Sequence, residues 1–114
     1  MTDRTIQKQE PTFARAKGMD SFCPLGPNLV RGIDWRGRSI RTWVDGDLRQ
    51  MGNTDDMIFS VPYIIHFVSE FMTLYPGDVI LTGTPKGVGK ILPGQTVRIE
   101  IDGLGTLENT VTAT

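Results

Sequence analysis

The chain has 114 residues, 39% of them hydrophobic and 22% charged, which suits one modest globular domain. Its 12 basic and 13 acidic side chains give a formal net charge of −1, which excludes the basic surface of a nucleic-acid-binding protein. No apolar run reaches the roughly 18 residues of a membrane span, and with no leader and a single cysteine we expect a cytoplasmic protein without a membrane partner.

The first 30 residues divide into a polar segment and a proline-rich segment. Residues 1–18 are polar and charged, with little periodic apolar content before Phe13, and a domain seldom begins in this way unless another segment precedes it. Residues 20–30 (DSFCPLGPNLV) carry two prolines and a glycine among small apolar residues. This composition favours an extended, packed loop over a helix, because proline removes helical hydrogen bonds.

Two hairpins are predicted farther along the chain. Residues 39–44 are strand-like, Asp45-Gly46 suits a two-residue turn with positive φ angles, and the chain returns through residues 48–50. Residues 96–101 alternate apolar and charged side chains, as a half-solvated strand does. Residues 105–111 can return beside this strand after a second Asp-Gly turn.

One amphipathic helix is predicted between the hairpins, from about residue 61 to 73. Ser60 is a suitable N-cap, and Pro62 fits the first turn, where its missing N–H costs nothing. Residues 75–78 end the helix, and residues 79–81 form a short apolar run typical of a buried strand. These elements predict an α+β fold dominated by strands. The apolar helix positions are Ile64, Ile65, Phe67, Val68, Phe71 and Met72.

The glycine-rich stretch at residues 79–91 (VILTGTPKGVGKI) is similar to a phosphate-binding loop only in part. After Gly83 the next glycines come at Gly87 and Gly89, and Ile91 stands where a phosphate-binding loop needs a hydroxyl group for magnesium. A Leu-Pro-Gly sequence then prevents the helix that such a loop requires. A nucleotide site is therefore disfavoured.

The turn at residues 82–85 (Thr-Gly-Thr-Pro) is a candidate anion site. It follows a predicted buried strand, so its backbone N–H groups and threonine hydroxyls would be displayed at the end of that strand. Such a turn suits a carboxylate or enolate oxygen, although a plain connecting turn explains the sequence equally well. If the fold brings Lys17 near this turn, its ammonium group could hold an anionic substrate; without such a neighbour it is a surface lysine.

The other reactive side chains favour structural roles. His66 lies mid-helix without a second ligand spaced for a metal, so we expect a partly buried structural residue. Cys23 lacks an identifiable base partner, and we expect a packed thiol. Three carboxylate pairs are interpreted as solvated or capping groups rather than metal ligands: Asp45 with Asp47, Asp55 with Asp56, and Glu100 with Asp102.

Taken together, several stretches resemble, in order, those of the fumarylacetoacetate hydrolase family. They are most similar to its 2-hydroxyhepta-2,4-diene-1,7-dioate isomerase and acylpyruvate hydrolase-like branch. A chance match of runs that span nearly the whole chain is implausible. The runs are RAKGMDSFCPLGP (15–27), IRTWVDGDLRQ (40–50), GNT with DMIF (52–54, 56–59), PGDVILTGTP with GVG (76–85, 87–89) and GLGTL (103–107).

The resemblance implies part of a mixed β-roll with one main helix, usually found as a homodimer, in enzymes of aromatic catabolism that bind Mg²⁺ or Mn²⁺. It implies a metal-stabilised enolate of a 2-oxo acid, formed during C–C bond hydrolysis, decarboxylation or keto–enol isomerisation. In this chain the resemblance assigns Lys17 to the substrate carboxylate or oxyanion. It assigns the backbone of Gly83 and the side chain of Thr84 to the other substrate oxygens, and Gln7 to the pocket wall.

The metal ligands of the family do not fall within this sequence. By resemblance, a Glu-x-Glu pair lies upstream, and the ligand aspartate would come immediately before Met1. We therefore expect residues 1–114 to be the C-terminal part of a catalytic domain that binds no metal and is inactive alone. Expected partners are a second copy, giving a homodimer, or the missing N-terminal half. The alternative is a catalytically silent truncated protein that acts as a dimerisation or binding module.

Overall fold

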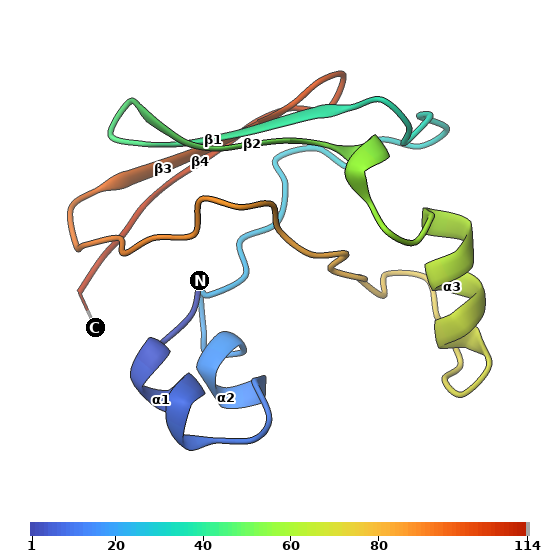
Figure 1. The fold of residues 1–114 in the computed structure, drawn as a ribbon, viewed down its shortest axis with the longest axis horizontal. Coiled ribbons are helices and arrows are strands. Elements are labelled where there is room, and N and C mark those ends of the chain that lie inside the picture. Colours follow the sequence, from blue (N-terminus) through green and yellow to red (C-terminus); the bar gives the residue numbers. More distant parts are fainter. Residues whose placement is uncertain (114) are drawn as a thin grey trace.

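One antiparallel sheet organises the fold. The computed structural model describes residues 1–113, in which four strands form a sheet in the order β2-β1-β3-β4. Figure 1 shows α1 and α2 together below this sheet and α3 apart from them. The elements are α1 (Arg4–Gln9), α2 (Ala14–Lys17), β1 (Ser39–Val44), β2 (Asp47–Asn53), the 3-10 helix η1 (Thr54–Asp56), α3 (Val61–Ser69), β3 (Thr96–Ile101) and β4 (Gly105–Thr110).

The β1–β2 hairpin forms as predicted. The turn residues Asp45 and Gly46 have φ angles of 50° and 88°, the conformation that the Asp-Gly pair accepts at low cost. The Asp45 carboxylate also accepts hydrogen bonds from the backbone N–H of Thr96 at 2.8 Å and from the Gln95 amide at 2.9 Å. The turn is therefore tied to the beginning of β3.

The second predicted hairpin, β3–β4, is also confirmed, and it joins the first through the central pair β1–β3. Arg41 of β1 spans this junction. Its Nη1 donates to Glu100 at 2.9 Å and its Nη2 to Asp102 at 3.3 Å. Both partners lie on or just after β3, so the ion pairs support the strand register that the backbone hydrogen bonds set.

The helix α3 begins where predicted and ends earlier. The Ser60 hydroxyl accepts from the Tyr63 N–H at 3.3 Å, which confirms the N-cap. The helix ends at Ser69 rather than near residue 73. Its last turn tightens, because the N–H of Glu70 bonds to Phe67 and the N–H of Phe71 to Val68, three residues back.

One sequence prediction about the rest of the backbone is wrong, and one pair of helices was not predicted. Residues 79–81 form no strand, and the side chains of Val79 and Leu81 are 56% and 72% exposed. No strand within residues 1–113 lies beside this segment to pair with it. Residues 1–18, for which the sequence analysis predicted no element, contain two helices. Asp3 caps α1 by accepting from the N–H groups of Thr5 and Ile6, a local signal that was present in the sequence.

Residues 20–30 have no helix, as predicted, but they are not packed. Leu25 is 62% exposed and Leu29 93% exposed. The loop therefore runs over the surface of the part of the chain that the structure describes.

The hydrophobic core is very small. Among residues 1–113, the buried hydrophobic side chains are Ala16 and Val44. The accessible surface is 8809 Å², whereas a compact monomer of 12.6 kDa exposes about 6,200 Å². The radius of gyration is 15.3 Å, against about 13 Å for a compact domain of this length. Much apolar surface is thus left without a cover.

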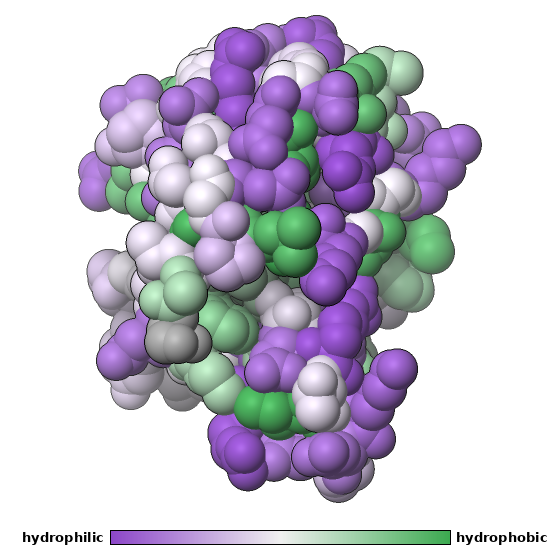
Figure 2. Space-filling view, turned by 90° about the vertical axis from the view of Figure 1, so that its left-hand side faces the viewer, coloured by the Kyte–Doolittle hydropathy of each residue, from purple (hydrophilic) through white to green (hydrophobic). Residues whose placement is uncertain are grey.

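A row of exposed aromatic side chains lies on and beside α3. Four aromatic rings follow one another at helical spacing, with centroid distances of 4.9, 6.5 and 5.4 Å along Phe59, Tyr63, Phe67 and Phe71. All four are about half exposed or more. The opposite end of the molecule is different, because Figure 2 shows mostly hydrophilic residues with scattered hydrophobic ones. No helix within residues 1–113 has the length and apolarity to cross a membrane.

We expect one carboxyl group beside the sheet to titrate at unusually low pH. Hydrogen bonds from the Arg36 side chain lower the pKa of Asp34 from 3.8 to about 2. Because the folded pKa is the lower one, the contribution of this pair to stability is complete above pH 3.8 and is lost as the pH falls through about 2. An NMR titration of the Asp34 carboxyl carbon should give a midpoint near 2. The variant R36Q should return it towards 3.8, and an unchanged midpoint would contradict the assignment.

Candidate functional site

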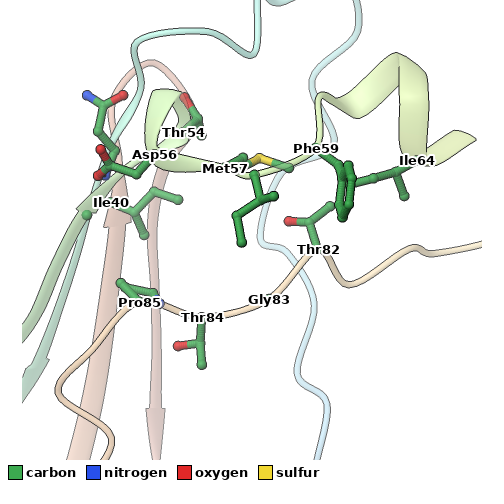
Figure 3. Close-up of a pocket in the computed structure, with 13 residues that line it drawn as sticks. Ile40, Thr54, Asp56, Met57, Phe59, Ile64, Thr82, Gly83, Thr84 and Pro85 are labelled. Atoms are coloured by element: carbon green, nitrogen blue, oxygen red, sulfur yellow. The ribbon is translucent and has the colours of Figure 1, made fainter.

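A cleft of about 350 Å³ lies beside the Thr82–Pro85 turn. Figure 3 shows its two sides: the turn faces Met57 and Phe59 across the opening, with Ile64 of α3 behind Phe59. The remaining lining residues come from β1, the end of β2, and η1. The cleft therefore has an apolar wall opposite the turn backbone and Thr82, while the Thr84 side chain points away from Met57 and Phe59 (Figure 3). The lining residues are Ile40, Gly52, Asn53, Thr54, Asp56, Met57, Ile58, Phe59, Ile64, Thr82, Gly83, Thr84 and Pro85.

The turn is fixed on strand β2 by close packing. Gly83 has a φ of 122°, which a residue with a side chain rarely adopts. A Cβ atom placed on Gly52 would lie 3.1 Å from the Pro85 ring, so a glycine allows the turn to approach the strand. A Cβ atom on Gly87 would collide with the carbonyl oxygen of Arg49. The loop thus lies directly against the β2 backbone.

The side chain of Gln50 holds the same turn by hydrogen bonds. Its Nε2 donates to the Thr84 hydroxyl at 3.0 Å and to the Pro85 carbonyl at 2.9 Å. Sequence reasoning missed Gln50 as a site residue. No local signal marks it, because its partners are 34 and 35 residues away and the docking of the loop is a tertiary contact.

The polar groups at the η1 end of the cleft are already paired. The Asn53 side chain accepts from the Asp55 N–H, and the Asp56 side chain accepts from the Asn53 N–H, which together form a capping box. The Thr54 hydroxyl accepts from the Arg38 N–H at 2.8 Å. The interpretation as a capping group is confirmed for Asp56, whereas the Asp55 carboxylate accepts from the Gly37 N–H at 2.8 Å.

Gln7 lies on α1 and Lys17 on α2, and neither is among the residues that line the cleft. The Lys17 ammonium donates to the Thr2 hydroxyl at 2.7 Å, and the Gln7 oxygen accepts from Arg4 at 2.6 Å. Figure 1 places α1 and α2 on the same side of the sheet as the chain around residues 79–91. Within residues 1–113, neither Lys17 nor Gln7 lines the cleft. Their convergence with Thr84 on one substrate remains a prediction.

Two predictions about reactive side chains are wrong in their burial. His66 is not partly buried: its side chain is 72% exposed and its Nε2 lies 3.7 Å from Glu70 one helical turn later. Its position on the outer face of α3 leaves it open to solvent. Cys23 is not a packed thiol but a free, exposed cysteine, because the loop around it lies on the surface.

The acidic side chains do not form a metal site in the part of the chain that the structure describes. Glu100 and Asp102 bind Arg41, so this face of β3 is occupied by ion pairs and is only partly solvated. Asp45 is engaged with the beginning of β3. No group of three or more His, Cys, Asp or Glu residues within residues 1–113 could hold an ion. These residues therefore do not fit the Mg²⁺ or Mn²⁺ that the resemblance implies.

A family model matches almost the whole chain. The model described as fumarylacetoacetate (FAA) hydrolase C-terminal matches residues 1–112. Among curated proteins, the chain is 43% identical over 121 aligned positions to oxaloacetate tautomerase YisK of Bacillus subtilis (strain 168). That match covers 97% of this chain and 40% of the tautomerase.

Solved structures match the fold closely. The 5-carboxymethyl-2-hydroxymuconate delta-isomerase of Mycobacterium smegmatis superposes with a TM-score of 0.96 at 44% identity, over 99% of this chain and 45% of that one. Maleylpyruvate hydrolase of Sphingobium sp. SYK-6, solved in complex with manganese (II) ion and pyruvate, has a TM-score of 0.78 at 41% identity, over 82% of this chain and 37% of that one. The predicted fold class is confirmed. The chain spans less than half the length of these relatives.

Replacing Gly87 by alanine should loosen the turn that borders the cleft. The φ angles of Gly87 and Gly77 are 100° and 101°, but only a Cβ at Gly87 meets other atoms. Both G87A and G77A should lose about 1–3 kcal/mol through backbone strain. G87A should lose about 1–3 kcal/mol more because the loop must move off β2. Urea unfolding of the two variants measures this difference, and equal losses would show that the loop does not rest on the strand.

Proposed function

The chain belongs to the fumarylacetoacetate hydrolase family, and from this premise we propose that it supplies the substrate-binding side of an enzyme acting on 2-oxo or 2,4-dioxo acids. The observation that carries the proposal is the Thr82–Pro85 turn, fixed against β2 at the edge of a cleft. Hydroxyl and backbone N–H donors held in this way suit an oxygen that carries negative charge.

The relatives support the same substrate class. Oxaloacetate and pyruvate, which appear in the names of the Bacillus tautomerase and the Sphingobium complex, are both 2-oxo acids. These proteins and the mycobacterial isomerase carry out tautomerisation, hydrolysis and isomerisation, as their names state. The proposed reaction is accordingly C–C bond hydrolysis, decarboxylation or keto–enol isomerisation through an enolate.

Lys17 is proposed to neutralise the substrate carboxylate or enolate oxygen. One of its three N–H donors is used by the Thr2 hydroxyl, which leaves two for a ligand. Within residues 1–113, no carboxylate lies within ion-pair distance of this ammonium group, so its charge is available to an anion. Gly83 and Thr84 are proposed to bind the remaining substrate oxygens, with Gln7 on the pocket wall.

A divalent ion, when bound, would supply Lewis-acid stabilisation of the enolate. The described side chains offer no ligand set for it, so the ligands must come from another segment or chain. We propose the N-terminal half of the family's catalytic domain as the partner, with a homodimer of the completed protein. If a partner covers the roughly 2,600 Å² of surface beyond that of a compact monomer, the two faces together bury about 5,200 Å², which is at the upper end of the range for obligate interfaces, about 2,000–5,000 Å² or more in total.

The same exposed surface favours a second candidate function. A chain without metal ligands could persist as a catalytically silent dimerisation or binding module, held by the aromatic face of α3. The two candidates differ in one property, because only the enzyme part needs to bind an oxo acid.

Pyruvate binding tests the proposed substrate site without requiring turnover. NMR titration of the chain with pyruvate should shift the signals of Thr84 and Lys17. Losing a hydrogen bond to a charged group costs about 1.5–3 kcal/mol, so K17M should weaken binding by about 10- to 100-fold. The matched control K8M removes another exposed lysine, at the end of α1, and should bind as the parent does. Equal affinity of K17M and K8M would reject the role of Lys17.

A further inference from the structure

The Gln50 side chain does not line the cleft, yet it forms hydrogen bonds to the turn that borders it. Its Nε2 donates to Thr84 Oγ1 and to the Pro85 carbonyl, and it lies 3.5 Å from the Lys86 carbonyl. Carbonyl oxygens cannot donate, so the nitrogen of the amide must face them. The opposite orientation would place the Gln50 oxygen against two other acceptors. The chemistry of its neighbours therefore fixes which way this amide points.

A β-bulge in β2 accompanies this placement. Thr42 pairs with Gln50 and Trp43 pairs with Leu48, which leaves Arg49 without a partner on β1. An extra residue of this kind redirects the side chains beside it. The carbonyl oxygen of this Arg49 is the atom against which Gly87 lies. The bulge thus orients the Gln50 side chain and provides the backbone against which the loop packs.

The hydrogen bond from Gln50 determines what the Thr84 hydroxyl can do. A hydroxyl has one hydrogen to donate, and Thr84 Oγ1 already accepts from Gln50. Its own hydrogen is therefore free for another acceptor. Within residues 1–113, the backbone N–H groups of Gly83 and Thr84 also have no hydrogen-bond partner. The turn presents three donors, and Gln50 orients the one that a threonine could otherwise rotate away.

We propose that Gln50 is a positioning residue that fixes the Thr84 hydroxyl as a hydrogen-bond donor to an anionic oxygen of the oxo acid. The inference rests on the proposed function. It adds a residue that acts through Thr84 and does not itself touch the substrate. Removing the Gln50 amide should then weaken ligand binding only while Thr84 keeps its hydroxyl.

A double-mutant cycle with pyruvate as the probe tests this coupling. Q50M keeps the side-chain length and removes the N–H groups, and T84V removes the hydroxyl. We expect each single variant to bind pyruvate about tenfold more weakly than the parent, and Q50M/T84V to bind no more weakly than T84V. The matched control is Q95M, which removes another glutamine amide that bonds to Asp45 at 2.9 Å, and it should leave pyruvate affinity unchanged. Amide NMR spectra establish that each variant is folded.

The outcomes separate the inference from the function on which it rests. If the parent chain binds no pyruvate, both the proposed function and the role of Gln50 are rejected. If the parent binds and Q50M binds equally well, only the role of Gln50 is rejected. Additive losses in Q50M/T84V would also overturn it, because Gln50 would then act independently of Thr84. The side-chain NH₂ signals of Gln50 should exchange with solvent at least tenfold more slowly than those of exposed Gln9, and similar rates would contradict the observed hydrogen bonds.

Discussion

The constraint on which the structure depends is the shortage of buried apolar surface. Only Ala16 and Val44 are buried hydrophobic side chains within residues 1–113, and the surface exceeds that of a compact monomer by about 2,600 Å². A sheet of four strands can hold its register by hydrogen bonds and ion pairs, but burial normally provides most of the stability. The aromatic face of α3 and the exposed segment at residues 79–81 belong to this uncovered apolar surface, which we propose a partner covers.

The candidate site is assembled from tertiary contacts that the sheet makes possible. The bulge at Arg49 gives the 82–89 loop a backbone to rest on, and glycines allow the close approach. Gln50 then fixes the turn by its amide. Lys17 is held separately, on α2, by Thr2. The proposed chemistry needs both parts, because the turn offers neutral donors and the lysine offers charge.

The sequence predicts what is local and fails where burial depends on distant segments. Both hairpins follow from alternation and Asp-Gly turns, and the start of α3 follows from Ser60 and Pro62. The apolar run at residues 79–81 has the composition of a strand, but no other strand within residues 1–113 pairs with it. Cys23 is exposed because no other segment within residues 1–113 covers its loop. Gln50 could not be found from the sequence, because its role arises only when the loop docks. The residue types made Lys17 and the Thr82–Pro85 turn candidates, the family resemblance assigned their roles, and their shared role is still a prediction.

We propose that this chain is the substrate-binding part of a metal-dependent oxo-acid enzyme and needs a second part for catalysis. The direct measurement is an assay of oxaloacetate tautomerisation. Three samples are compared: the chain alone, the part of the Bacillus tautomerase that precedes the segment matched by this chain, and a mixture of the two. Each sample is assayed once with Mn²⁺ and once with a chelator. We expect turnover only in the mixture with Mn²⁺. Chelator-sensitive turnover by the chain alone, or a mixture that forms a stable complex yet remains inactive, would contradict it.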